Sequence, residues 1–213
     1  MSDAPAAGWS LLYVADPMCS WCWGFSASLD ALRRARPDLP LRLVMGGLRV
    51  DGEPLDARLR EFLAHHWQEV AARSGQAFDL RGLEREGWTY TTEPACRAVV
   101  TARAADASKA LPMLHAVQRA FYAEARDTTD AGVLADVAAS VGLDRAAFES
   151  SFASPAMRDA AAADFLFAQR LGVRGFPMLA AVRDGRGEVV SPGWTPPDEL
   201  VRRVESVVGP SGD

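Results

Sequence analysis

Two cysteines separated by two residues form the most chemically distinctive segment of the chain, Cys19-Ser20-Trp21-Cys22. A thiolate at the first position can attack a disulfide, and a thiol three residues later can resolve the mixed disulfide that results. An apolar run at residues 11–15 precedes the pair, and apolar residues at helical spacing follow it. Because backbone N–H groups at a helix start lack partners, a sulfur placed there is favoured as thiolate. We expect Cys19 to be the nucleophile and Cys22 the resolving cysteine.

The same spacing can also belong to half of a zinc site, so the other candidate ligands matter. Outside the pair the chain has a third cysteine, Cys96, and three histidines, His65, His66 and His115. No two of them stand at ligand spacing, and adjacent histidines diverge on a helix. The sequence therefore favours redox chemistry over a metal site, with an unreactive structural pair as the remaining alternative. Cys96 lies on an apolar helix stripe and is expected to be a small buried hydrophobe, with a third redox thiol as the alternative.

The elements that position the pair indicate an α/β fold. Residues 11–15 and 41–45 are short apolar runs typical of strands. Residues 177–182 and 188–190 enclose a Gly-rich turn and predict a hairpin, and residues 198–208 predict a closing amphipathic helix. Between about Leu55 and Leu171 the apolar period stays close to that of a helix, with stop and start signals but no strand. The predicted layout is β-α-β, a helical block, then β-β-α.

The composition is that of an ordinary soluble protein and excludes several function classes. The 213 residues are 49% hydrophobic and 24% charged, which is enough chain to bury a sizeable core. A net charge of -5 gives nucleic acid no broad electrostatic reason to bind. The first residues do not resemble a secretory signal, and no apolar stretch approaches the roughly 18 residues of a membrane span. We expect a cytoplasmic protein with neither a nucleic-acid partner nor a membrane segment.

The order of strand, CxxC, helix, strand, helical block, Gly-Phe-Pro, hairpin and last helix resembles the DsbA-like branch of the thioredoxin superfamily. The segment Asp16-Pro17-Met18-Cys19-Ser20-Trp21-Cys22-Trp23-Gly24-Phe25 is similar to one in the cytosolic FrnE-like proteins, which are often described as predicted protein-disulfide isomerases. The resemblance implies an α/β thioredoxin-like fold with a large all-helical insertion. It assigns residues 1–50 and 172–213 to the thioredoxin-like domain and residues 51–171 to the helical insertion domain.

The resemblance also implies a substrate site around the cysteines. Pro177 matches the family's cis-proline, which lies against the CxxC and presents backbone groups to an extended substrate. Phe176 precedes it, where many relatives carry a smaller residue. The expected substrate contacts flank the pair and the proline, and they are Trp21, Trp23, Gly175, Phe176 and Met178. For Trp21, packing on the same helix face as Phe25 is an equally good interpretation.

Together these observations predict a thiol-disulfide oxidoreductase that exchanges or isomerises disulfides in proteins or peptides, with Cys19, Cys22 and Pro177 as catalytic residues. The electrons reside in the cysteine pair and pass to or from a cellular thiol reductant or oxidant, so neither a cofactor nor a metal is expected. Because Ser20-Trp21 supplies no positive charge, we expect a less oxidising couple than that of DsbA.

Two alternatives stay open. The first is a glutathione-dependent small-molecule isomerase or transferase of the same superfold, which usually has serine where Cys19 stands. The second is a non-catalytic chaperone-like module that binds partners through the aromatic surface.

Overall fold

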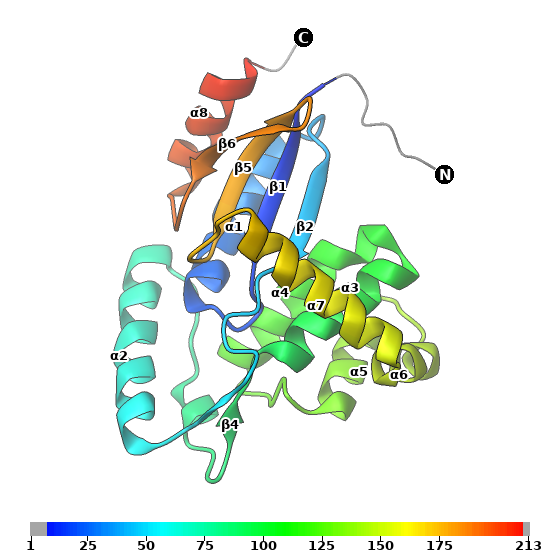
Figure 1. Ribbon diagram of the computed structural model, residues 1–213. Coiled ribbons are helices and arrows are strands. Elements are labelled where there is room, and N and C mark those ends of the chain that lie inside the picture. Colours follow the sequence, from blue (N-terminus) through cyan, green and yellow to red (C-terminus); the bar gives the residue numbers. More distant parts are fainter. Residues whose placement is uncertain (1–7, 211–213) are drawn as a thin grey trace.

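The computed structural model describes residues 8–210 and combines a mixed sheet with a helical region (Figure 1). The strands are β1 (Ser10–Ala15), β2 (Leu41–Met45), β3 (Glu53–Pro54), β4 (Thr89–Tyr90), β5 (Met178–Arg183) and β6 (Arg186–Ser191). The helices are α1 (Ser20–Ala35), α2 (Ala57–Ser74), α3 (Glu93–Ala105), α4 (Ala110–Tyr122), α5 (Ala131–Ser140), α6 (Arg145–Ala153), α7 (Pro155–Arg170) and α8 (Pro197–Val208). Short 3-10 turns occur at Leu80–Leu83 and Ala107–Lys109.

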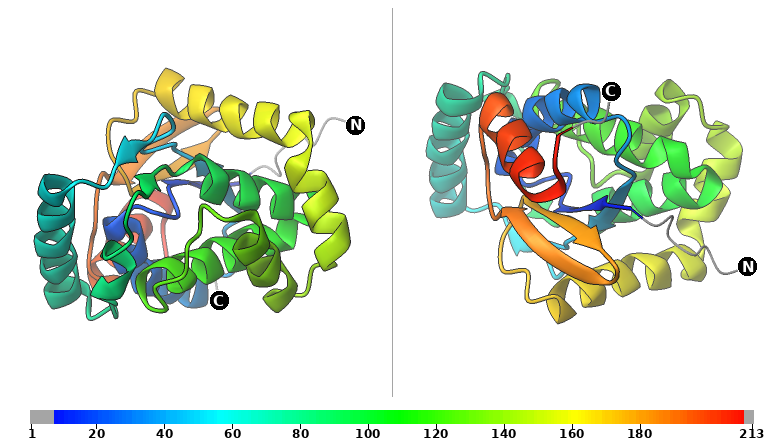
Figure 2. Two further views of the ribbon diagram at one scale, coloured as in Figure 1. Left: turned by 90° about the horizontal axis from the view of Figure 1, so that it is seen from below. Right: turned by 90° about the horizontal axis from the view of Figure 1, so that it is seen from above.

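The main sheet has the order β2-β1-β5-β6, with β1 parallel to β2 and β5 antiparallel to both of its neighbours. Because side chains alternate along a strand, Tyr13 of β1 faces one side of the sheet and Val14 the other. Helices α1 and α8 cover the Tyr13 side, whereas α7 covers the Val14 side, as the right-hand view of Figure 2 shows. The predicted α/β thioredoxin-like architecture is confirmed.

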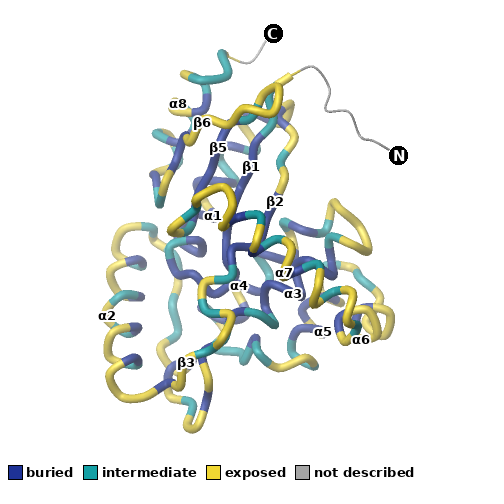
Figure 3. Tube along the Cα trace, viewed as in Figure 1, coloured by how far each residue is buried: buried dark blue, intermediate teal, exposed yellow. Residues whose placement is uncertain are grey.

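The helical region lies between β2 and β5 in the chain and contains α2 to α7, as predicted. The expectation that no strand interrupts it is wrong, because β4 pairs antiparallel with β3 in a small second sheet, Glu53 opposite Tyr90. Strands of two residues are too short to show alternation. One buried cluster runs from the main sheet into the helical region (Figure 3), and the two-domain division at residues 51–171 remains a prediction.

Most helix ends follow the signals in the sequence. Gly75 ends α2 with φ 74°, a conformation that glycine adopts without strain, and Ser154 caps α7 by accepting a hydrogen bond from the Met157 amide at 3.3 Å. Phe62 lies one helical turn after the buried Leu59 on α2 and is nevertheless 56% exposed. Among residues 8–210, none of the helices has the length and apolar character needed to span a bilayer.

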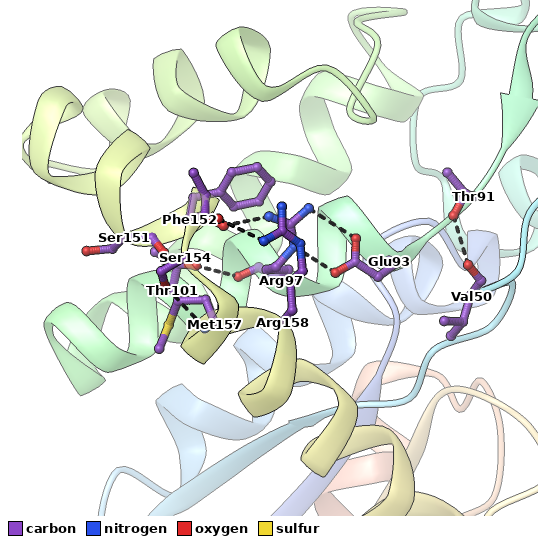
Figure 4. Close-up of polar contacts among 11 residues, drawn as sticks. Val50, Thr91, Glu93, Arg97, Thr101, Ser151, Phe152, Ser154, Met157 and Arg158 are labelled. Carbon is purple, nitrogen blue, oxygen red and sulfur yellow. Dashed lines mark hydrogen bonds and ion pairs between the residues drawn. The ribbon is translucent and has the colours of Figure 1, made fainter.

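Buried polar contacts fix the helices of the insertion against one another (Figure 4). Arg97 of α3 is 8% exposed and pairs with Glu93 at 2.7 Å. Its guanidinium also donates to the carbonyl of Phe152 at 2.5 Å and lies 3.9 Å from the centroid of that residue's ring. Arg97 therefore ties α3 to the end of α6.

The outer edge of β2 is occupied by an ion pair rather than by another strand. Arg103 of α3 donates to the carbonyl of Leu43 at 2.7 Å and pairs with Asp164 of α7 at 2.9 Å. Asp164 in turn accepts a hydrogen bond from the amide of Met45 at 2.9 Å. The two side chains bind backbone groups that an adjacent strand would otherwise pair.

Candidate active site

The two cysteines of the CxxC segment lie where β1 passes into α1, as expected. Cys19 is the N-cap residue of α1 and Cys22 lies in its first turn. Cys19 is 7% exposed and Cys22 is fully buried, so Cys19 is the one that solvent reaches. Among the described residues, Cys19, Cys22 and Cys96 are all free thiols.

The hydrogen bonding of Cys19 differs from the expectation that its sulfur accepts from the helix start. Its side chain makes no capping hydrogen bond; instead the thiol donates to the carbonyl oxygen of Phe176, with Sγ and O 3.5 Å apart. A protonated sulfur has a hydrogen to donate, and the Phe176 carbonyl is the acceptor within reach. The contact brings the start of α1 against the loop before β5.

Cys22 is held as a thiol by its surroundings. Burial raises the pKa of Cys22 well above its usual range, and the neighbouring Cys19 sulfur raises it further, while the backbone N–H of Asp16 lowers it in part. Burial chiefly raises the pKa of the Tyr13 phenol, on β1, and the neighbouring Cys22 and Cys19 raise it further. The two cysteines therefore differ in both access and environment.

The loop before β5 contributes the second wall of the site. The peptide bond between Phe176 and Pro177 is cis, the isomer that the resemblance implies for Pro177. Gly175 is exposed, Phe176 is half-buried, and both Pro177 and Met178 are buried. Of the substrate contacts expected here, Gly175 and Phe176 are open to solvent, whereas Met178 belongs to the core beneath the loop.

The two tryptophans around the cysteines have different surroundings. Trp21 is half-buried and lies in an aromatic patch with His66 of α2 and Trp194, at centroid distances of 5.7 and 6.2 Å. Trp23 is only 8% exposed, and its indole N–H donates to the carbonyl of Ala77 at 3.0 Å. Trp21 thus keeps a free surface next to the cysteines, while Trp23 is better described as a core residue than as a substrate contact. Phe25 is fully buried, so it does not share the exposed face of Trp21.

Asp16 is a site residue that the sequence analysis left without a role. Its carboxylate is fully buried and accepts hydrogen bonds from the amides of Met18 at 2.8 Å and Leu48 at 2.7 Å. The thiol of Cys96 donates to the same carboxylate at 3.3 Å. Burial raises the pKa of Asp16, and these backbone donors oppose the rise. The signal available in the sequence was an acidic residue directly after a buried strand and three positions before Cys19.

The helical region also contacts the cysteine loop directly. Tyr90 of β4 is 2% exposed, and its hydroxyl donates to the carbonyl of Met18, the residue before the nucleophile. Nothing in the local sequence marks Tyr90, because its partner is 72 residues away.

Cys96 contacts the site through Asp16, and His66 contacts it through Trp21. Cys96 is fully buried, and burial raises its pKa well above the usual range, which fits the description as a small buried side chain. Across residues 8–210, no group of three His, Cys, Asp or Glu side chains is placed to hold a metal ion.

Comparison with known proteins agrees with this geometry. A family model described as the DSBA-like thioredoxin domain matches residues 11–205. The chain belongs to the DsbA-like thioredoxin family. Within this DsbA-like family, a candidate protein disulfide isomerase from Nitrosomonas europaea superposes with a TM-score of 0.87 at 32% identity, over 93% of this chain and 97% of that one.

A second DsbA-like relative is the cytosolic disulfide reductase DsbM from Pseudomonas aeruginosa, with a TM-score of 0.79 and 32% identity over 92% of this chain and 97% of that one. The same reductase is also known in a structure with glutathione, which matches at 30% identity and a TM-score of 0.77. A 2-hydroxychromene-2-carboxylate isomerase is similar at 17% identity and a TM-score of 0.61, over 93% of this chain and 94% of that one, which shows a shared fold alone.

Proposed function

We propose that this DsbA-like protein is a thiol-disulfide oxidoreductase that acts on protein or peptide disulfides through Cys19. The single observation that carries the proposal is the asymmetry of the pair. Cys19 is partly accessible and faces the loop before β5, whereas Cys22 is fully buried and its pKa is raised by burial and by Cys19. A nucleophile must reach its substrate, and a resolving thiol must stay protonated until the mixed disulfide has formed.

In the reducing direction, the Cys19 thiolate attacks one sulfur of a substrate disulfide. A bond forms between that sulfur and Cys19, and the other substrate sulfur leaves as a thiolate that takes up a proton. Cys22 then loses its proton and attacks the Cys19 sulfur, which releases the second substrate thiol and leaves a Cys19–Cys22 disulfide. The substrate gains two electrons, and the cysteine pair is oxidised by the same two electrons. Pro177 and the Phe176 carbonyl line the path of the substrate chain.

Glutathione is the proposed reductant. Two glutathione molecules return the pair to dithiol and leave as glutathione disulfide, which balances the cycle without a bound cofactor. The support is that DsbM, 32% identical, is a cytosolic disulfide reductase whose structure has also been determined with glutathione. On the same ground we propose a cytoplasmic location for this protein.

The alternatives have weaker support. A glutathione-dependent isomerase needs no second sulfur, yet here the second sulfur is present, is fully buried and influences the pKa of its neighbour Tyr13. A purely binding role fits the aromatic patch of Trp21, His66 and Trp194, but it leaves the free thiol of Cys19 unexplained.

The test is the reduction of insulin by glutathione in the presence of the protein and its single-cysteine variants. We expect Cys19→Ser to abolish turnover and Cys22→Ser to accumulate a mixed disulfide on Cys19 that mass spectrometry detects. Cys96→Ala is the matched cysteine control: Cys96 is fully buried and its thiol contacts the Asp16 carboxylate rather than the cysteine pair, so turnover should be retained. Turnover that survives Cys19→Ser, or full activity of Cys22→Ser on a glutathione-linked small substrate, would reject the proposal in favour of the other classes.

A further inference from the structure

The double glycine after β2, Gly46-Gly47, lies beside the exchange site and has no role in the proposed chemistry. Gly46 is buried, and its amide donates to the carbonyl of Ala15 at 2.8 Å, which extends the pairing of β2 with β1 to the start of the cysteine loop. The next residue, Leu48, donates its amide to Asp16 at 2.7 Å. The glycine loop is therefore fixed to the segment that leads into Cys19.

The aromatic ring of Phe176 rests directly on Gly46. A Cβ placed on Gly46 would lie 2.1 Å from Cε1 and 2.2 Å from Cζ of that ring, distances that real Cβ atoms do not show. Gly47, with φ 70°, receives the ring of Phe165 from α7 in a similar way, with its Cβ position 2.8 Å from Cδ1. Two aromatic rings thus occupy the space that side chains at these two positions would need.

The packing of Phe176 on Gly46 affects Cys19 because Phe176 contacts both residues. Its ring lies on Gly46 and its carbonyl oxygen accepts the Cys19 thiol at 3.5 Å. A ring displaced from Gly46 would shift the backbone of Phe176, whose carbonyl oxygen contacts Cys19. Because the loop continues directly into β5 at Met178, it has little freedom to absorb such a shift elsewhere.

We infer that Gly46 is a positioning residue for disulfide exchange at Cys19, acting through the ring of Phe176. The inference rests on the proposed function, in which the substrate chain lies along Phe176 and Pro177. Disulfide exchange needs three sulfurs in line, and a displacement of about 1 Å at a reacting group can cost on the order of a hundredfold in rate. A methyl group at position 46 would displace Phe176, which lines the proposed path of the substrate chain, without contacting either cysteine.

The experiment is a double-mutant cycle on Gly46→Ala and Phe176→Ala. The first rate is that of a cysteine peptide linked to thionitrobenzoate, whose release by Cys19 is followed by absorbance. The second is alkylation of Cys19 by iodoacetamide, a reagent small enough to react without contacting Phe176 or Pro177. We expect Gly46→Ala to slow the peptide reaction by about tenfold or more and to change alkylation by less than about threefold. In the Phe176→Ala background, Gly46→Ala should change the peptide rate by less than about twofold, because the clash is gone.

A matched control is Gly187→Ala in β6, where the added Cβ meets its nearest atom at 3.7 Å, an ordinary contact. It should leave both rates unchanged. Equal slowing by Gly46→Ala in both backgrounds, or parallel slowing of peptide exchange and alkylation, would show a general structural effect and overturn the inference. An unchanged peptide rate in Gly46→Ala would overturn it as well.

If Gly46→Ala alone does not fold, the comparison within the Phe176→Ala background still decides the matter, since a loss there contradicts a role exerted through the ring. If the unsubstituted protein reacts with the peptide, the proposed function stands and these outcomes test only the role of Gly46. If the unsubstituted protein forms no mixed disulfide, the proposed function fails and the inference falls with it.

Discussion

The buried carboxylate of Asp16 offers the sharpest test of the electrostatics beneath the cysteines. It is fully buried, and it holds the amides of Met18 and Leu48 together at 2.8 and 2.7 Å. Asp16→Asn keeps the shape of the side chain and removes its charge. The amide group can still accept one of the two backbone hydrogen bonds, while its NH₂ group faces the other donor.

The sign of the pH dependence follows from the raised pKa of Asp16. Below its ordinary value of 3.8 the carboxyl is protonated in both folded and unfolded chains, so it does not lower the free energy of unfolding. As pH rises above 3.8, the unfolded chain ionises first, and the wild type loses stability until pH passes the folded pKa. The loss is about 1.4 kcal/mol for each pH unit that separates the two values. Asp16→Asn does not titrate, so its stability lacks this decline.

The assay is urea unfolding of wild type and Asp16→Asn at a series of pH values from 4 to 7. The free energy of unfolding of the wild type minus that of the variant should fall as pH rises and then become constant. Asp38→Asn is the control that should give a nearly constant difference over this range, because the Arg36 guanidinium lowers the pKa of Asp38 and its contribution is lost only below the ordinary value of 3.8. A wild-type-minus-Asp16→Asn difference that stays flat or increases with pH would refute the argument that burial dominates at Asp16.

Two further predictions concern contacts that hold the scaffold around the site. Arg103→Ala leaves the Asp164 carboxylate and a β2 carbonyl without their partner; the expected loss is about 3 kcal/mol, and calorimetry should show a melting temperature lower by about 6–12 °C. A melting temperature within 2 °C or so of wild type would contradict this. Tyr90→Phe removes the donor to the Met18 carbonyl, so we expect about 1–2 kcal/mol less stability by urea unfolding and slower peptide exchange at Cys19. Unchanged exchange in a destabilised Tyr90→Phe variant would show that the hydroxyl supports the fold without placing the nucleophile.

The parts of the site that the sequence predicts are those encoded locally. A strand ending at Ala15, a helix starting at Ser20 and a cysteine on either side of that start are all readable within a dozen residues, and the structure has them there. The strand of the Gly-Phe-Pro segment was predicted for the same reason, since an apolar run and a turn follow it directly.

The missed residues depend on contacts between distant segments. Tyr90 reaches Met18 across 72 residues, and the ring of Phe176 reaches Gly46 across the sheet. Helical spacing placed Trp21 on the same face as Phe25, but the packing of α2 and α4 covers Trp23 more completely than Trp21. In the structure Trp23 stacks on Tyr122 of α4, while Trp21 contacts His66 of α2 edge to face.

The ion pair between Arg103 and Asp164 has a consequence for how copies of this protein can meet. A second molecule that tried to add a strand alongside β2 would first have to release the Leu43 carbonyl and the Met45 amide from those side chains. It would also leave a carboxylate and a guanidinium stranded in the new junction. Edge-to-edge pairing of two sheets, the usual risk of an exposed edge strand, is therefore disfavoured along β2.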